Sequence, residues 1–237
     1  MQINKRLIID GQSVPVENDM VRLRLNQVGE ASFDIPMEAN WRHRPLVEMY
    51  AALNTREEYL MFTGAVVKVE RIKPGMSRLH CKELSIALQL AIAINKVRVR
   101  ARDVIALVEQ KTGLHFLLPA KAPYLDEIRV NFQFSGSCLD ALETVRARWG
   151  LKDTVWYQLP DGRMYFGHWT QGPFNAAPVP IEPRLITAQD PSKSALVLPY
   201  IPALRPGMLV ESNINFRLDS LVFTRDQLQV LYKKVGK

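Results

Sequence analysis

The sequence Arg-Pro-Leu-Val-Glu at residues 44–48 recurs near the other end of the chain as Arg-Pro-Gly-Met-Leu-Val-Glu at residues 205–211, with two residues inserted. Each copy leads into sequence rich in strand-forming residues, at 59–69 after the first and at 215–223 after the second. The repeated motif therefore predicts two related β modules on either side of a different, helix-containing segment. A chance match is the alternative, because internal repeats are normally established over longer stretches.

The composition is that of a soluble globular protein with enough apolar residues for a core. The 237 residues are 47% hydrophobic and 23% charged, which allows one large domain or a few small ones. No stretch approaches the ~18 consecutive apolar residues of a transmembrane helix. The first residues lack the apolar run and cleavage site of a signal peptide, so we expect synthesis in the cytoplasm and no membrane-spanning segment.

Cysteines and charge exclude little by themselves. Cys81 and Cys138 have no metal-binding or redox spacing, and we expect both to be buried free thiols. The net charge of +7 could attract nucleic acid if it were concentrated on one surface. Basic residues cluster only mildly, at 98–102, 146–148 and 233–237, and we interpret all three clusters as solvated faces.

Residues 1–97 are predicted to form a first β-barrel module. Val21, Leu23 and Leu25 alternate with arginines, as in a half-buried strand. The longest alternation runs over 84–94, with Leu or Ile at every second position and mostly small residues between them. We interpret this stretch as a strand covered on both faces, although its alanines would also suit a helix.

Residues 98–170 are predicted to form an inserted α/β domain. Its expected elements are a helix over 103–112, strands over 114–118 and 128–134, a second helix ending at Trp149, and a hairpin over 155–169. Gly113 is placed to end the first helix, and either Ser135 or Ser137 can cap the second.

Residues 171–237 are predicted to hold a proline-rich connector and a second β-barrel module. The connector is expected to be extended because four prolines lie between 173 and 183. Short strand-like runs follow at 184–188, 195–201, 207–212, 216–224 and 227–235. The predicted fold class is therefore α+β and mainly β, with two small β-barrel-like modules flanking an inserted α/β domain.

No sequence pattern indicates catalytic chemistry. There is no nucleophile elbow and no phosphate-binding loop, and the acidic pairs 57–58 and 126–127 are too simple to define a glycosidase cleft. Metal-ligand spacing is absent among the four histidines, His43, His80, His115 and His168. We therefore expect no enzyme activity, no catalytic, cofactor-binding or metal-binding residues, and no cofactor.

Aromatic side chains crowd the predicted hairpin, at Trp156, Tyr157, Tyr165, Phe166 and Trp169. On a basic protein they could form a stacking platform for single-stranded nucleic acid. We favour packing against the preceding helices, because Arg163 is the only basic residue within the hairpin.

Five stretches carry a resemblance to a known family: 62–69 with its central Gly64, 101–105 leading to 112–114, 137–142 leading to 149–151, the hairpin 156–166, and 204–210. In this order they resemble a barrel strand, the two inserted helices, the hairpin and the opening of the second barrel in baseplate or tail hub proteins of tailed bacteriophages, the family that includes the hub part of type VI secretion spikes. The chain is compact for this family, and its second barrel looks abbreviated.

The resemblance implies a structural role in a homotrimer. Two barrels per chain would give three chains a ring of six quasi-equivalent units, which could join a sixfold tail tube to a threefold spike or fibre. The implied partners are other copies of the chain, the tail tube or distal tail protein above, the spike or fibre below, and phage DNA passing transiently through the channel. The implied location is the tail tip or baseplate of the virion.

Two other functions stay open at this stage. A nucleic-acid-binding β-barrel protein is favoured by the charge and the aromatic hairpin, and a tail-associated cell-wall hydrolase by the proteins that accompany phage hubs. Neither explains why β, α/β and β blocks occur in this order.

Overall fold

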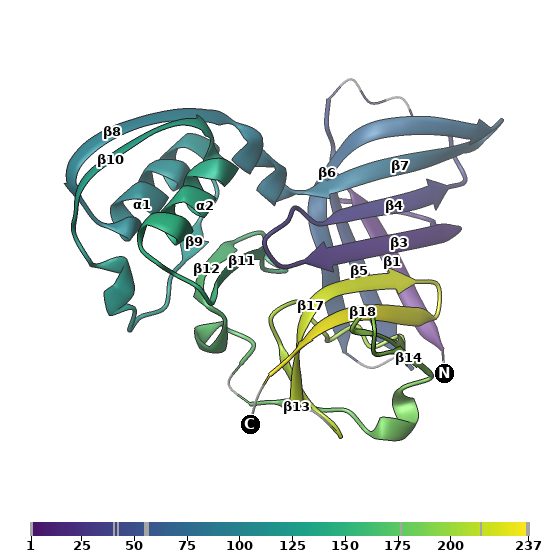
Figure 1. Ribbon diagram of the computed structural model, residues 1–237. Coiled ribbons are helices and arrows are strands. Elements are labelled where there is room, and N and C mark those ends of the chain that lie inside the picture. The colour runs from purple at the N-terminus through teal and green to yellow at the C-terminus, as the bar shows by residue number, and fades with distance from the viewer. Residues whose placement is uncertain are drawn as a thin grey trace. The chain divides into compact units, whose positions relative to one another are not determined.

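The computed structural model describes residues 2–39, 41, 43–54, 57–175, 177–213 and 215–235. The chain divides into two compact units, one formed by Met1–Glu83 with Pro173–Lys237 and the other by Leu84–Gly172. The first unit holds a large, almost wholly antiparallel sheet, and the second holds two α-helices and two small sheets (Figure 1). No helix within the described ranges is long and apolar enough to cross a membrane. The protein is therefore mainly β with few helices.

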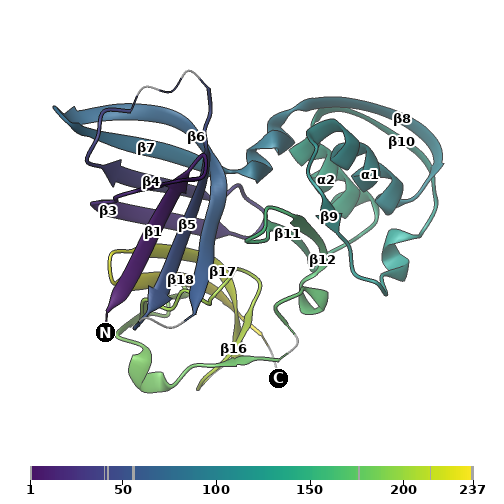
Figure 2. The ribbon, with the colours of Figure 1, turned by 180° about the vertical axis from the view of Figure 1, so that it is seen from behind.

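The large sheet has 13 strands in the part of the chain that the structure describes. From the N-terminal segment come β1 (Ile3–Ile9), β2 (Gln12–Val14), β3 (Asn18–Arg24), β4 (Glu30–Ile35), β5 (Leu46–Leu53), β6 (Glu58–Lys73) and β7 (Met76–Glu83). From the C-terminal segment come β13 (Val179–Pro180), β14 (Ala188–Asp190), β15 (Ala195–Pro199), β16 (Leu209–Glu211), β17 (Asn215–Thr224) and β18 (Gln227–Lys234), with a short 3₁₀ helix at Pro183–Leu185. Seen from behind, β1, β5 and β6 lie side by side (Figure 2).

Two groups of five strands in this sheet have the same order. β3, β4, β7, β6 and β5 are neighbours in that sequence, and β14, β15, β18, β17 and β16 are neighbours in the corresponding sequence. We call these the first set and the second set. All pairings within both sets are antiparallel. The topology therefore repeats within one chain.

The register of the two sets also matches. β6 shifts register against β7 between Val66 and Lys68, and β17 shifts register against β18 between Leu218 and Ser220. A β-bulge of this kind re-aims a strand, and here both copies carry it at the same step. Val66 and Leu218 are therefore equivalent positions.

The repeated motif of the sequence lies at equivalent positions of this register. The N–H of Val66 donates to the carbonyl oxygen of Pro45 at 3.1 Å, and the N–H of Leu218 donates to that of Met208 at 2.9 Å. The valine of each copy, Val47 or Val210, is fully buried. The interpretation of the motif as a mark of two related β modules is thus supported by strand order and register.

The two sets are joined into one sheet by β3 and β17. Residues Ser220–Thr224 of β17 pair antiparallel with Met20–Arg24 of β3. Side chains of both sets meet in one hydrophobic core, where Phe33 packs edge-on against Phe62 at 6.3 Å between ring centres. Each fully buried aromatic side chain of this kind contributes about 1.5–3 kcal/mol. The structure thus shows a continuous sheet across the two predicted modules.

The unit formed by Leu84–Gly172 begins differently from the prediction. Its elements are a 3₁₀ helix (Leu84–Gln89), β8 (Ala91–Val99), α1 (Ala101–Thr112), β9 (Phe116–Leu117), a 3₁₀ helix (Pro123–Leu125), β10 (Arg129–Ser137), α2 (Cys138–Arg148), β11 (Thr154–Gln158), β12 (Met164–His168) and a 3₁₀ helix (Trp169–Gln171). β8 pairs with β10, and β12 lies between β11 and β9.

The predicted strand over 84–94 is wrong in its first half. Leu84–Gln89 winds into a 3₁₀ helix, and its Ser85 N–H is satisfied by the side chain of Gln158 at 3.0 Å. Leu90 is 47% exposed, so the stretch is not covered on both faces within the chain. Alternation of Leu and Ile with small residues does not separate a strand from a short helix whose backbone donors find side-chain partners.

The helices and the hairpin follow the prediction because local chemistry defines them. The Asp103 carboxylate accepts the N–H of Arg100 at 2.9 Å at the start of α1, and Gly113 ends that helix with a left-handed φ of 72°. Ser137, not Ser135, caps α2 and accepts the N–H of Asp140 at 3.1 Å. The hairpin forms between β11 and β12 in the predicted place.

Candidate interface site

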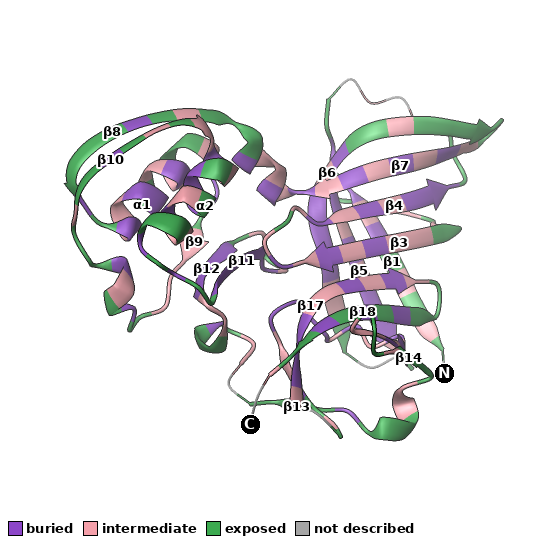
Figure 3. Cartoon of the chain, in the orientation of Figure 1, coloured by how far each residue is buried: buried purple, intermediate pink, exposed green. Residues whose placement is uncertain are grey.

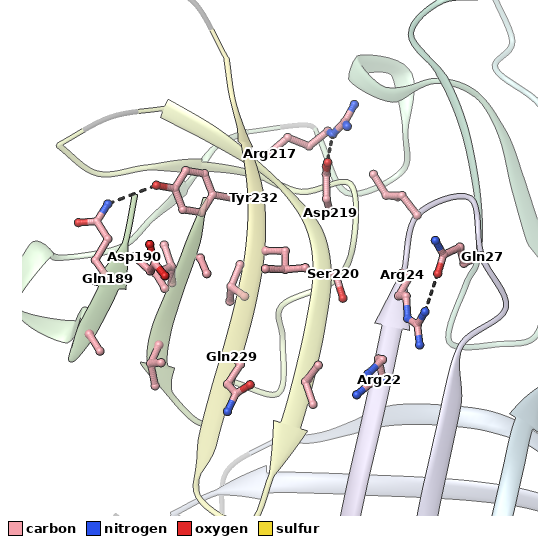
Figure 4. Close-up of a pocket in the computed structure, with 18 of the residues that line it drawn as sticks. Arg22, Arg24, Gln27, Gln189, Asp190, Arg217, Asp219, Ser220, Gln229 and Tyr232 are labelled. Atoms are coloured by element: carbon pink, nitrogen blue, oxygen red, sulfur yellow. Dashed lines mark hydrogen bonds and ion pairs between the residues drawn. The ribbon is translucent and has the colours of Figure 1, made fainter. Parts of the chain in front are cut away.

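A groove of about 800 Å³ opens on the outer face of the sheet, along β3, β17, β18, β15 and β14 (Figure 4). It exists because side chains alternate along each strand. Leu221, Phe223 and Val230 point into the core, and their neighbours in sequence are left to line the groove. The groove is therefore built on the joint between the two sets.

The floor of the groove is apolar and uncharged. Val197, Val222 and Leu231 project from three strands, and Leu231 is 49% exposed. Gln229 and Ser220 lie between them (Figure 4). Exposed apolar side chains gathered in a concavity are typical of a surface that binds another macromolecule or an extended segment.

One wall of the groove is basic. Arg22 and Arg24 each donate to Glu30 at 2.7 Å, and Lys82 donates to the same carboxylate at 2.7 Å. The bond from Lys82, reinforced by the two arginines, holds the pKa of Glu30 below its usual range. One carboxylate thus faces three cations, and this wall keeps a positive charge.

The remaining walls carry two separate carboxylates. Asp219 accepts a bond from Arg217 at 2.7 Å. Asp190 accepts a bond from the Ser192 hydroxyl at 2.5 Å, which lowers the pKa of Asp190. Asp190 is therefore ionised at neutral pH and unsuited to act as a general acid.

The equivalent face of the first set has a different chemistry. At the positions equivalent to Val197, Val222, Gln229 and Leu231 stand Asp34, Glu70, Arg78 and His80. Arg78 donates two bonds to Asp34, at 2.6 and 2.9 Å, and His80 lies 3.1 Å from Glu70. Strand order and register are thus shared, whereas the outer surfaces are not.

The sequence did not predict this groove. Its signal is the uninterrupted apolar run at 221–223, where strict alternation would place a polar side chain at the outward position 222. The isolated Leu231 within β18 is a second signal of the same kind.

The histidines and acidic pairs occupy separate places. His43 contacts Asp10, His80 contacts Glu70, His115 contacts Glu109, and His168 contacts Thr170. Each acidic residue of the pairs with a described ion-pair partner faces an arginine: Glu58 faces Arg6, Asp126 faces Arg102, and Glu127 faces Arg129. Within the described ranges no group of three or more His, Cys, Asp or Glu side chains could hold a metal ion.

The aromatic hairpin is a packed core, as we favoured. Trp156, Tyr157, Tyr165 and Phe166 are at most 2% exposed, and the Trp156 indole N–H donates to Glu143 of α2 at 3.2 Å. Burial raises the pKa of both tyrosines. Rings enclosed in this way cannot stack on the bases of a nucleic acid.

The basic clusters of the sequence do not merge into one surface patch. Arg98 and Arg100 are exposed, Arg146 pairs with Glu143 of its own helix, and Arg148 lies over the Phe132 ring. In the tail, Lys233 and Lys234 are exposed, while positions 236 and 237 lie outside the described residues. The interpretation as solvated faces holds for these described arginines and lysines.

Over nearly its whole length the chain has the fold of bacteriophage tail proteins and of a hub-like component of type VI secretion. The 43 kDa tail protein of prophage MuSo2 from Shewanella oneidensis superposes with a TM-score of 0.74 at 8% identity, covering 98% of each chain. The tail protein from Neisseria meningitidis MC58 superposes with a TM-score of 0.69 at 12% identity, covering 100% of this chain and 98% of that one. Identities this low define the fold alone.

A third similar structure is an E. coli component of the type VI secretion system, described as structurally similar to the bacteriophage T4 tail proteins gp27 and gp5. It has a TM-score of 0.63 at 11% identity, covering 98% of this chain and 77% of its own. In sequence, an uncharacterized 58.7 kDa protein of Haemophilus phage HP1 is 21% identical over 232 residues, 96% of this chain. The chain spans 43% of that relative, less than half its length. No protein-family model matches the chain.

Proposed function

We propose that the chain is a structural subunit of a phage tail tip or baseplate, a homotrimeric hub ring between a sixfold tail tube and a threefold spike or fibre. The observation that carries the proposal is the pair of strand sets with shared order and register but different outer faces. Three chains would present six sets of one topology. The same six sets would alternate between two surface chemistries.

This combination suits an adaptor between two symmetries. Backbone features common to both sets, such as the bulge and the strand order, repeat six times around the ring and can meet a sixfold partner. Features of one set only, such as the apolar groove, repeat three times and can meet a threefold partner. Rings of this kind close through heterologous contacts, in which one surface binds a different surface of the next copy.

Three finer features belong to the same proposal. Each strand set closes into a barrel-like module within the ring, and the ring surrounds a channel for DNA. The modules comprise residues 1–97 and 171–237, with 98–170 as the inserted domain. The chain has no catalytic role, and its location is the tail tip of the virion, in contact with the tail tube or distal tail protein and with the spike or fibre.

The stoichiometry of the assembled protein tests the proposal. Light scattering and native mass spectrometry of the purified full chain, alone and co-expressed with the neighbouring tail proteins, should give three copies per complex. A cryo-EM reconstruction of a tail tip should place the chain in a threefold ring. A monomer or dimer under both conditions, or a ring of another order, would show that the proposal is wrong.

A further inference from the structure

One edge of β17 is occupied by two strands in succession. β16 pairs with its first residues, up to Arg217. Beyond the bulge β3 takes over on the same edge, because the carbonyl oxygen of Asp219 accepts the N–H of Leu25 at 2.9 Å and Ser220–Thr224 pair with Met20–Arg24. This edge carries the joint between the two sets.

The equivalent edge of β6 has only the first of these two partners. β5 pairs with it up to Ala65, and the N–H of Val66 bonds to Pro45 as described above. Past that point, no strand among the described residues pairs with this edge over Val67–Lys73. The end of β6 is largely exposed, as the green colour in Figure 3 shows, although Glu38 forms a 2.9 Å ion pair with Arg71.

The ladder alternation identifies which groups of β6 are open. Asp219 and Val67 are equivalent positions, and hydrogen-bonded positions recur at every second residue of an antiparallel strand. Val69 and Arg71 therefore direct their backbone N–H and C=O toward the open edge. Lysines and bulges protect exposed edges in many proteins, and β6 has both, so the edge could simply be a protected one.

The strand of the second set that corresponds to β3 is β14. Glu17 donates its N–H to the carbonyl oxygen of Asp34 at 2.8 Å, and Thr187 donates in the same way to Val197 at 2.9 Å, which fixes the equivalence. β14 pairs with β15 on one side only, within the described part of the chain. The second set thus has an open strand where the first set has its joint.

We propose that the open edge of β6 pairs antiparallel with the open edge of β14 from a second copy of the chain. The inference rests on the proposed ring and identifies the strands that close it. The contact would repeat between chains the joint that β17 and β3 make within one chain. Thr224 lies opposite Met20 in that joint, which places Ile72 opposite Asp190 of the neighbouring copy.

The joint between chains is shorter than the one within the chain. The turn after β14 begins at Pro191, which has no N–H to donate, so pairing is confined to the end of β6 and the three residues of β14. Arg71 and Lys73 flank the position opposite Asp190, so opposite charges meet at the joint. Because the two edges differ, copies join head to tail and can close a ring.

A disulfide across the joint tests the register. Ile72 and Asp190 correspond to a pair without hydrogen bonds, whose Cα atoms lie about 4.5 Å apart, within the range that a disulfide spans. In the full chain carrying Ile72→Cys and Asp190→Cys, with Cys81→Ala and Cys138→Ala, mild oxidation should yield a covalent trimer as the main species. Either single-cysteine variant alone should give no cross-linked species, and a mixture of the two should give covalent dimers.

Matched variants separate this inference from the ring itself. Lys68→Cys with Asp190→Cys, four residues out of register, should not cross-link. Arg71→Pro removes an N–H that faces the open edge and should abolish assembly of a folded monomer, whereas Arg71→Ala should retain assembly. A native trimer that neither cross-links through 72 and 190 nor responds to Arg71→Pro would overturn the inference and leave the ring standing. A chain that never assembles would overturn both.

Discussion

The guanidinium of Arg205 donates to the carbonyl oxygen of Leu60 at 2.7 Å, linking the loop before β16 to the start of β6. It also donates to the carbonyl oxygens of Pro202 and Leu204, at 2.6 and 2.7 Å. Arg205 is only 5% exposed, and burial lowers its pKa to about 10, so it stays protonated at neutral pH. The loop around the second copy of the motif is therefore organised by one buried cation.

Replacing Arg205 by Met should lower the free energy of unfolding by about 2–4 kcal/mol, since it leaves buried carbonyl groups without donors. Arg44 begins the first copy of the motif but is exposed, so Arg44→Met should cost less than about 0.5 kcal/mol. Urea unfolding followed by circular dichroism measures both. Equal effects of the two substitutions would contradict the structural role assigned to Arg205.

Gly64→Ala should be among the most damaging small substitutions. A Cβ at Gly64 would lie 2.1 Å from the backbone oxygen of Lys82 and 2.7 Å from the Phe62 ring. Because a backbone atom cannot yield, we expect a loss of about 2–4 kcal/mol, with reduced soluble yield. The comparison is Gly113→Ala, which meets no atom within 4 Å and should cost only the ~1–2 kcal/mol of a left-handed backbone. Thermal unfolding of the two variants ranks them.

The two thiols should report separately on the two compact units. Cys81 and Cys138 are at most 1% exposed, and burial raises the pKa of Cys138 and that of Cys81 to about 12. Thiol reagents at pH 8 should therefore react more than ~100-fold more slowly with the native than with the unfolded chain. Labelling of Cys81→Ala and Cys138→Ala across a denaturant series should give each unit its own midpoint. Fast labelling in native buffer would show that these sites are open.

Stability should fall in acid through the ion pairs on the outer face of the first set. The bonds from Arg78 lower the pKa of Asp34, so this carboxylate stabilises the fold above its unfolded pKa of about 4 and loses that contribution as the pH falls through its folded pKa. Arg78→Met should cost roughly 0.5–1 kcal/mol at pH 7, since the pair is partly solvated, and should flatten the decline below pH ~4. Gln229→Met, at the equivalent position of the second set, should leave the pH profile unchanged.

Sequence reasoning predicted the features that are defined by neighbouring residues. Ser137 caps α2 and Gly113 ends α1 through contacts within a few residues, and the hairpin turns at its Asp-Gly pair. It failed at Leu84–Gln89, where a partner 73 residues away, Gln158, satisfies the Ser85 N–H. The repeated motif pointed to two related modules, and strand order and register bear out the relation.

The joint and the groove could not be predicted from local patterns. β3 and β17 pair across most of the chain, and nothing within either strand names the other. The groove depends on which side of β17, β18 and β15 faces outward once that pairing has formed. Both features are therefore properties of the assembled sheet.

The pairing of β3 with β17 has a consequence for biosynthesis. When β3 leaves the ribosome, roughly 200 more residues must be translated before its partner exists. At ~5–20 residues per second this interval lasts about 10–40 s, during which the nascent chain presents an unsatisfied strand edge to other polypeptides. Production of this protein is thus vulnerable before its last strands emerge, and slow translation or a lack of chaperones should reduce the soluble yield.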